Sequence, residues 1–245
     1  MGFKEDYYPE SKFGGFSDID GTKNFYTRVQ ALATPESVVI DYGAGRGSYR
    51  ETLQSIMREL RTLHGRVKKV IGLDVDEALA GNPFLDEYHV FDGNQWPLAD
   101  SSADLCVCDF VMEHLPDPEM FFAEARRVLK DGGYLCIRTP NSWGYVALAA
   151  RLIPNRRHAQ VVSNVQDNRK AVDVFPTLYR CNSIPKMRKT LARYGFDHAV
   201  YGYEAEPAYF SFSRVAYRLG MLYQQMTPNL LRTTIFAFAQ LRKKD

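Results

Sequence analysis

The stretch VVIDYGAGRG at residues 38–47 decides the fold class of this chain. An apolar run of strand length ends at Asp41 and opens directly into glycines at alternate positions, 43, 45 and 47. This pattern predicts a buried strand that leads into a tight turn, because glycine adopts backbone conformations that other residues avoid. A dinucleotide-binding turn has the spacing G-x-G-x-x-G, and Ser48 stands where its third glycine would fall. The spacing therefore disfavours a dinucleotide in an architecture that also serves other cofactors.

The composition is that of a globular protein with one core. At 245 residues and 28.0 kDa, with 45% hydrophobic residues, the chain is expected to form a single domain over residues 1–245. The formal net charge of +2 lacks the basic excess of a general nucleic-acid binder, so we expect no nucleic-acid partner. No apolar leader opens the chain and no run approaches about 18 apolar residues, so we expect a soluble, cytoplasmic protein.

The four cysteines show no spacing typical of a metal or redox site. Cys106 and Cys108 alternate on one predicted strand, Cys136 lies on another, and Cys181 lies in a loop. We expect reduced structural thiols and, since no compact cluster of His and carboxylate residues is visible, no bound metal.

Apolar runs of strand length alternate with segments of helical period, which predicts an α/β fold with a parallel sheet covered on both faces. Expected helices follow the first strand near 53–63, the second near 76–80 and the fourth at 118–129, and a further one occupies 184–194. The expected strands are 37–41, 67–73, 87–91, 103–110, 134–138 and 196–203, with a last antiparallel strand at 233–241.

Three segments lie outside this alternation. Residues 141–182 and 206–231 are insertions near one end of the sheet, where open α/β folds bind ligands, and we interpret them as a substrate cap. Residues 1–35 are too rich in aromatic residues for a disordered tail, and we interpret them as a lid over the cofactor. The alternative is that these rings simply cover the edge of the sheet. They are Phe13, Phe16, Phe25 and Tyr26.

Residues 36–140 and 196–241 together resemble the class I S-adenosylmethionine (SAM) dependent methyltransferases, of the methyltransferase type 11/12 kind. The resemblance implies a Rossmann-like seven-stranded sheet, parallel with one antiparallel strand, with SAM as cofactor and S-adenosylhomocysteine (SAH) as product. One departure is the distance of 31 residues from Gly43 to Asp74, which requires a longer first helix or exit loop. The matching motifs are DYGAGRG, GLDVD, FDGNQWPLAD, DFVMEHL and RVLKDGGYLCIRTPN.

Acids at the ends of successive strands supply the polar groups that such a cofactor needs. Asp41 can orient the amino end, Asp74 can accept bonds from the ribose diol, and Asp92 can accept one from the adenine amino group. The alternative is that each acid merely caps the next helix. The positions that the resemblance assigns to the cofactor are Asp41, Gly43, Ala44, Gly45, Asp74, Val75, Asp92, Gly93, Asn94, Asp109 and Phe110.

Methyl transfer to a hydroxyl needs in-line positioning and removal of a proton. Of five histidines, only His114 is placed by a motif near the expected methyl group, so it is the predicted base or acceptor-orienting residue. The alternative is a purely structural bond from His114 to the loop, and Glu113 and Asp109 are the next candidates.

The opening segment resembles the N-terminal extensions of bacterial methyltransferases associated with surface polysaccharides, which implies a sugar, glycan or sugar-nucleotide acceptor. Residues 151–170 hold five basic residues and one acid, which suits an acidic acceptor, although a solvated loop would look alike. A quinone, lipid or other small natural product is the alternative acceptor, and a non-catalytic SAM-binding or partner-binding module is the alternative class. The candidate acceptor-binding residues are Trp143, Tyr145, Arg156, Arg157, His158, Tyr179 and Arg180.

The second insertion predicts an amphipathic helix with Arg214 and Arg218 beside its apolar stripe. We expect the stripe to pack on its own domain, with a partner subunit or peripheral membrane contact as the alternatives. The stripe consists of Val215, Leu219, Leu222 and Met226.

Overall fold

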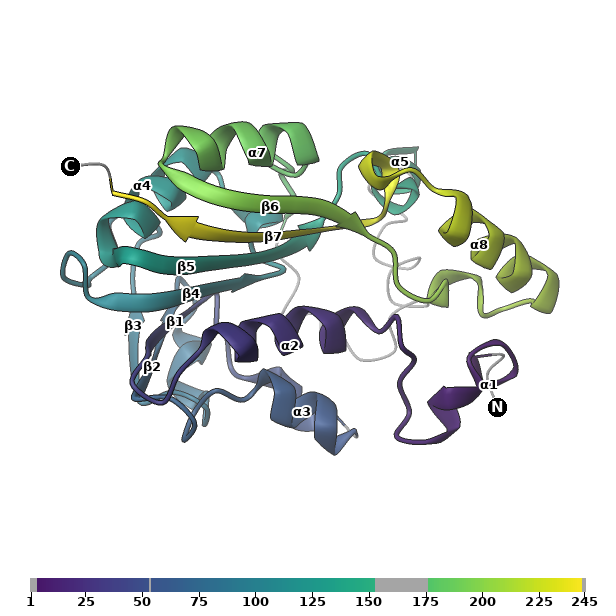
Figure 1. Cartoon of the computed structure of the whole chain (residues 1–245), viewed down its shortest axis with the longest axis horizontal. Helices are drawn as coiled ribbons and strands as arrows, with labels where there is room; N and C mark the ends of the chain where they lie inside the picture. Colours follow the sequence, from purple (N-terminus) through teal and green to yellow (C-terminus); the bar gives the residue numbers. More distant parts are fainter. Residues whose placement is uncertain (1–3, 53, 153–175, 244–245) are drawn as a thin grey trace.

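A seven-stranded sheet with the order β3-β2-β1-β4-β5-β7-β6 forms the centre of the computed structural model, which describes residues 4–52, 54–152 and 176–243 (Figure 1). Strand β7 runs antiparallel to both of its neighbours, and all other pairs are parallel. The predicted fold class is confirmed. The strands are β1 (Val38–Tyr42), β2 (Lys69–Asp74), β3 (Glu87–Val90), β4 (Ala103–Asp109), β5 (Leu129–Pro140), β6 (Phe196–Tyr203) and β7 (Thr234–Leu241).

Helices cover both faces of this sheet (Figure 1). Helices α2 (Gly21–Leu32) and α3 (Ser55–Arg61) lie on one face, and α4 (Pro118–Val128) and α7 (Ile184–Arg193) lie on the other. Because side chains alternate along a strand, Val39 of β1 joins the core under α2 while Ile40 joins the core under α4. Asp41 follows the parity of Val39 and therefore belongs to the α2 face.

The segment after β1 differs from the predicted helix at 53–63. A short 3-10 turn, η2 (Ser48–Glu51), comes first, α3 covers only seven residues, and a loop then leads to β2. Gly47 starts the turn in the left-handed conformation, and the buried Tyr49 ring stacks on Phe84 with centroids 4.4 Å apart. The extra length between the glycine turn and Asp74 therefore lies in this turn and in the exit loop.

Two further boundaries differ from expectation. Residues 77–81 form a 3-10 helix, η3 (Glu77–Gly81), in place of the predicted helix at 76–80. Strand β5 begins at Leu129, well before the expected 134, because residues 129–133 continue the pairing with β4 past a register shift.

The N-terminal helix α2 is part of the core. Phe25 is fully buried and packs against Phe236 and Phe238 of β7, at centroid distances of 5.4 and 5.5 Å. Phe13 is exposed. Phe25 therefore packs on the face of an interior strand and not at the edge of the sheet. The lid role of residues 1–35 stays a prediction.

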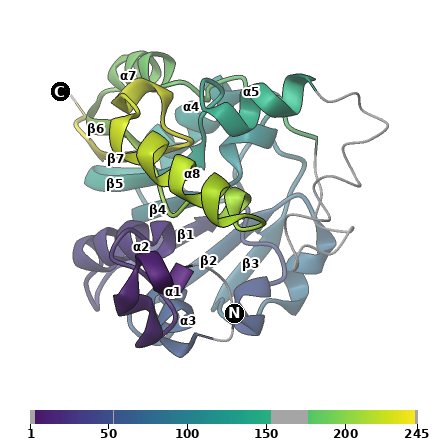
Figure 2. The ribbon, with the colours of Figure 1, turned by 90° about the vertical axis from the view of Figure 1, so that its right-hand side faces the viewer.

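The two insertions leave the sheet at the same edge. Pro140 of β5 pairs with Thr234 of β7, which pairs with Tyr203 of β6, so both start at the carboxyl ends of the parallel strands. Beyond this edge lie α5 (Tyr145–Leu152), α8 (Arg214–Met226) and α1 (Lys4–Tyr7) (Figure 2). Tyr7 of α1 stacks on Tyr217 of α8 at 5.3 Å, which ties the chain start to the second insertion.

The expectation that the α8 stripe packs on its own domain is wrong for the residues that the structure describes. Its four apolar side chains are 53–79% exposed, because α8 turns Tyr217 and Gly220 inward instead. None of the helices in the described ranges is both long and apolar enough to span a bilayer. The four cysteines are free and buried, as predicted.

Candidate functional site

The glycine turn after β1 is closed on one side and open on the other. A Cβ on Gly43 would lie 2.2 Å from the Val111 side chain, so only glycine fits there. A Cβ on Gly45, whose φ is +50°, would meet no heavy atom within 4 Å. Gly43 is thus required for packing, whereas Gly45 presents bare backbone to open space where a ligand can approach.

Asp74 lies directly beside this turn. Its carboxylate accepts hydrogen bonds from the backbone N–H of Gly45 at 2.8 Å and of Asp76 at 3.0 Å. The Asn82 amide donates to the carbonyls of Ala44 and Gly45, each at 3.1 Å. The ends of β1 and β2 therefore form one rigid unit, with Asp74 at its rim.

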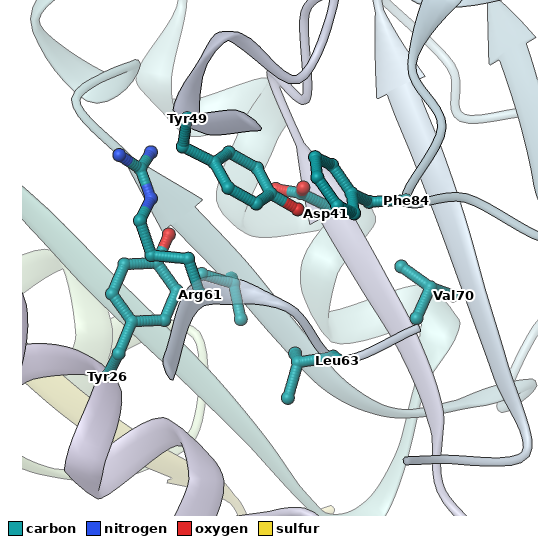
Figure 3. A pocket seen from close by; sticks show the side chains of 8 residues that line it. Tyr26, Asp41, Tyr49, Arg61, Leu63, Val70 and Phe84 are labelled. Atoms are coloured by element: carbon teal, nitrogen blue, oxygen red, sulfur yellow. The ribbon is translucent and has the colours of Figure 1, made fainter. Parts of the chain in front are cut away.

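Asp41 lies in a narrow cavity of about 10 Å³ on the α2 face, which Figure 3 shows from close by. Burial raises the pKa of Asp41 to about 7, with further increases from Asp109 and Asp74 and an opposing effect of Arg61. A positive partner beside Asp41 would favour its charged form and lower this pKa. The lining includes Tyr26, Tyr49, Arg61 and Phe84.

Asp109, at the end of β4, is held by three bonds. Arg138 of β5 donates to both of its oxygens, at 2.6 and 2.7 Å, and the Tyr26 hydroxyl donates at 2.9 Å. Although burial alone would raise it, the pKa of Asp109 is lowered, chiefly by Arg138. Asp109 is therefore a structural anion that anchors α2 to the sheet, which argues against its use as a base.

Phe110 adopts a strained backbone at this edge. Its φ is +56°, its N–H donates to the Arg138 carbonyl at 2.8 Å, and its ring lies 4.7 Å from the Arg138 guanidinium. Non-glycine residues rarely adopt this conformation, and such strain is concentrated at functional sites.

The third strand-end acid, Asp92, is exposed. It accepts bonds from the backbone and side-chain amides of Asn94, both at 3.0 Å, and these bonds lower its pKa. Gly93 lies beside the exposed side chain of Val75, 3.5 Å from where its own Cβ would stand. Residues 92–94 thus continue the same rim past β3, and their binding role stays a prediction.

His114 and Glu113 form a polar pair in the turn η4 (Met112–His114) after β4. His114 Nδ1 lies 2.9 Å from the Pro176 carbonyl, which can only accept, so Nδ1 carries the hydrogen. Nε2 faces Glu113 Oε1 at 3.7 Å. Burial raises the pKa of Glu113, whose other oxygen accepts from Thr139 at 2.9 Å. The alternative role of His114 is a purely structural bond to the loop, and the bond to the Pro176 carbonyl is of this kind.

The candidate acceptor-binding residues are dispersed. Trp143 and Arg180 are exposed, whereas Tyr145 packs between Phe210 and Tyr223 at 5.6 and 5.1 Å and holds the cap together. Tyr179 has a φ of +52° and donates its N–H to the Glu113 carbonyl at 3.1 Å, so it borders the turn η4. Three others, Arg156, Arg157 and His158, lie outside the described residues.

Two arginines at the site escaped prediction. Arg138 lies in the fifth strand, where a buried charge cannot be foreseen from an apolar pattern, and Arg61 ends α3 far from any motif. In the part of the chain that the structure describes, no three His, Cys, Asp or Glu side chains are grouped so that they could hold a metal ion.

Comparison with known proteins agrees with this geometry. Residues 40–137 match the family model of the methyltransferase domain. A probable SAM-dependent methyltransferase of Mycolicibacterium smegmatis is 36% identical over 110 residues, which cover 42% of this chain and 38% of that protein. A malonyl-[acyl-carrier protein] O-methyltransferase of Hahella chejuensis is 33% identical over 41% and 36%. A ubiquinone biosynthesis O-methyltransferase of Histophilus somni is 26% identical over 59% and 64%.

Solved structures share the fold over almost the whole chain. A Haloferax volcanii putative methyltransferase, in complex with the Trm112 activator, superposes with a TM-score of 0.55 and 16% identity over 92% of this chain and 93% of that one. The [4+2]-cyclase SpnF superposes at 0.54 with 13% identity, over 90% and 82%. At such identity the likeness concerns the fold alone, and a cyclase among the neighbours shows that the fold does not fix the reaction.

Residues 40–137 therefore match a methyltransferase domain, and the sequence similarity of this part of the chain extends to probable SAM-dependent methyltransferases. The chain spans well under half the length of the first curated relatives that it matches.

Proposed function

We propose that the whole chain is an enzyme that transfers a methyl group from SAM to a small-molecule or glycan acceptor. The proposal starts from the match of residues 40–137 to the methyltransferase domain. The observation that carries the proposal is the open side of Gly45, next to Asp74 and in the turn that follows Asp41. A SAM molecule presents a positive sulfonium, an ammonium group and a ribose diol, and the rim offers carboxylates for cations and for hydroxyl donors.

Each strand end has a proposed share in binding. Asp41 receives the ammonium group, Asp74 the ribose hydroxyls and Asp92 the adenine amino group. Gly43 and Ala44 supply the turn, Val75, Gly93 and Asn94 border the base, and Asp109 with Phe110 lines the pocket near the sulfonium. The proposed ribose contact of Asp74 is supported by its surroundings. Two backbone N–H groups fix its carboxylate, and its side chain stays partly accessible.

SAM supplies a methyl group that is lost by direct displacement, so the protein has to orient the acceptor and remove its proton. His114 is our proposed base or orienting group. Its Nδ1 hydrogen is bonded to the Pro176 carbonyl, so in the neutral imidazole Nε2 carries the lone pair that a base needs.

For the acceptor we propose a sugar, glycan or sugar nucleotide. Exposed Trp143 and Arg180 at the carboxyl edge support it, since aromatic rings stack on sugar faces and arginine binds phosphate or carboxylate. A quinone or lipid acceptor is the second candidate, favoured by the exposed apolar stripe of α8 at the same edge. One relative named above belongs to ubiquinone biosynthesis.

A pair of glycine variants tests the cofactor site. Gly45 and Gly65 both have left-handed backbones, with φ of +50° and +76°, and a Cβ on either would meet nothing within 4 Å. Alanine should cost each variant about 1–2 kcal/mol of stability. Calorimetric titration with SAH should show weaker binding for Gly45→Ala only, because only that methyl group would occupy the cofactor's space.

The same proteins are then assayed for transfer of labelled methyl from SAM to nucleotide sugars, polysaccharide, quinones and cell extract. Transfer that Gly45→Ala loses and Gly65→Ala keeps supports the enzyme. SAH binding without transfer to any acceptor would instead identify a non-catalytic SAM-binding module, and equal SAH affinity in both variants would reject the proposed site.

A further inference from the structure

Arg61, at the last position of α3, has a hydrogen-bond donor that its neighbours leave unused. Although burial alone would lower it, the pKa of Arg61 is raised by Tyr26, Asp109 and Tyr49. Its Nη2 lies 3.7 Å from Asp109 Oδ2, beyond hydrogen-bond distance, while Asp109 is already bound by Arg138 and Tyr26. The Arg61 Nε is buried and has no hydrogen-bond partner among the described residues. The Nε–H of Arg61 therefore remains a donor for a further anion.

Aromatic rings hold this guanidinium in place. Its central carbon lies 4.6 Å from the centre of the Tyr49 ring and 5.5 Å from that of Tyr26. Tyr49 in turn stacks on Phe84 at 4.4 Å, and Figure 3 shows the guanidinium beside Tyr49, among the residues that line the same cavity as Asp41. Little side-chain entropy remains to be lost when Arg61 binds an anion.

Asp41 and Arg61 therefore line one cavity, where the ionised form of the carboxyl group and the guanidinium carry opposite charges. Arg61 lowers the pKa of Asp41, although burial outweighs this effect and leaves that pKa raised. The methionine end of SAM has the matching pattern, since it carries an ammonium and a carboxylate on one carbon. A planar guanidinium fork can bind such a carboxylate through two parallel hydrogen bonds.

We propose that Arg61 binds the α-carboxylate of SAM, so that Asp41 and Arg61 together hold the zwitterionic end of the cofactor. The inference rests on the proposed SAM-dependent function and adds a binding residue that lies outside every motif. In this proposal α3 does more than cover the sheet, because the residue at its end helps to position SAM, the methyl donor.

The test compares SAM with decarboxylated SAM, which keeps the sulfonium and the ammonium but lacks the carboxylate. Arg61→Met removes the charge at similar length and helix propensity, and Arg58→Met is its control on the same helix. We expect wild type and Arg58→Met to prefer SAM over decarboxylated SAM by about 10- to 100-fold, as a charge-assisted bond would give. Arg61→Met should lose this preference and bind decarboxylated SAM as the wild type does.

A uniform loss of affinity for both ligands in Arg61→Met would overturn the proposal, because Arg61 would then act only through the shape of the pocket. An unchanged preference would overturn it as well. Arg61→Lys covers the case in which the methionine variant fails to fold, and it should keep part of the preference, since lysine keeps the charge without the fork. Failure of the wild type to bind either ligand would refute the proposed function itself.

Discussion

Asp41 shows at the scale of one residue how a binding site lowers stability. In the folded chain its pKa is about 7, far above the ordinary value of 3.8, chiefly because of burial. The folded state therefore holds a proton that the unfolded state has released, and stability falls as pH rises from about 4 to about 7. At pH 8 the folded state is therefore less stable than it would be with a neutral residue at this position. We attribute this loss of stability to the placement of a carboxylate where the proposed ammonium group would bind.

Asp41→Asn should therefore gain stability relative to the wild type as pH rises. Between pH 5 and pH 8 the difference in unfolding free energy should grow in favour of the variant by about 1–3 kcal/mol. Urea unfolding at both pH values measures it, with Asp92→Asn, at an exposed position, as the control. A difference that stays constant with pH would mean that Asp41 is charged throughout.

In the wild type, SAM affinity should increase from pH 6 to pH 8, because the ammonium group binds the charged form of Asp41, whose pKa is about 7. Titration with SAM at both pH values should show no such increase in Asp41→Asn.

At the scale of an element, the turn η4 joins the end of β4 to the returning segment of the first insertion. Leu178 and Tyr179 donate their N–H groups to the Glu113 carbonyl at 2.7 and 3.1 Å, and His114 Nδ1 donates to Pro176. The position of His114 therefore allows two roles, holding the loop through Nδ1 or accepting a proton through Nε2.

Two substitutions separate these roles. The amide of His114→Asn can replace the Nδ1 bond to Pro176 but offers no basic nitrogen, whereas His114→Ala removes both. If His114 is the base, both variants should lose turnover by about 100-fold or more with SAH affinity unchanged. Steady-state transfer assays decide, and near-normal turnover of His114→Asn would assign the residue to loop anchoring alone.

At the scale of the whole molecule, the carboxyl edge carries an exposed apolar surface along α8. Val215, Leu219, Leu222 and Met226 lie on one side of this helix, and residues 207–244 contain no Asp or Glu. Arg214 pairs with Asp6 at 3.0 Å and Arg218 donates to Tyr7, so these two polar side chains of α8 contact α1. A helix of 13 residues is about 20 Å long, too short to bury alone the roughly 1,200 Å² of a stable dimer.

We therefore expect the apolar stripe of α8 to lie on a lipid surface. The wild type should co-sediment with vesicles of phosphatidylcholine and phosphatidylglycerol, and Leu219→Ser with Leu222→Ser should abolish this. Tyr88→Ser with Val90→Ser, at exposed positions of β3, is the matched control and should still bind. An unbound wild type would refute membrane contact, and self-association that the α8 variant alone loses would assign the stripe to a second copy.

The sequence by itself determined the sheet and the kind of cofactor. Strands and most helix starts follow from apolar periodicity and from Pro, Gly and Asp at their ends, and these signals are local. The glycine turn and the acids at 41 and 74 met at one edge because parallel strands all end there. The spacing G-x-G-x-G disfavoured a dinucleotide for the same local reason.

Only the tertiary structure decided what surrounds these residues. Arg61 and Tyr26 meet Asp109 across gaps of 48 and 83 residues, and no periodic pattern encodes such a contact. A 3-10 turn precedes the predicted helix, and its Tyr49 stacks on Phe84, a contact that no local pattern indicated. The α8 stripe stayed exposed because Tyr217 took the inward side of the helix. A local sequence specifies local backbone, whereas burial, charge compensation and exposure depend on which distant segments pack together.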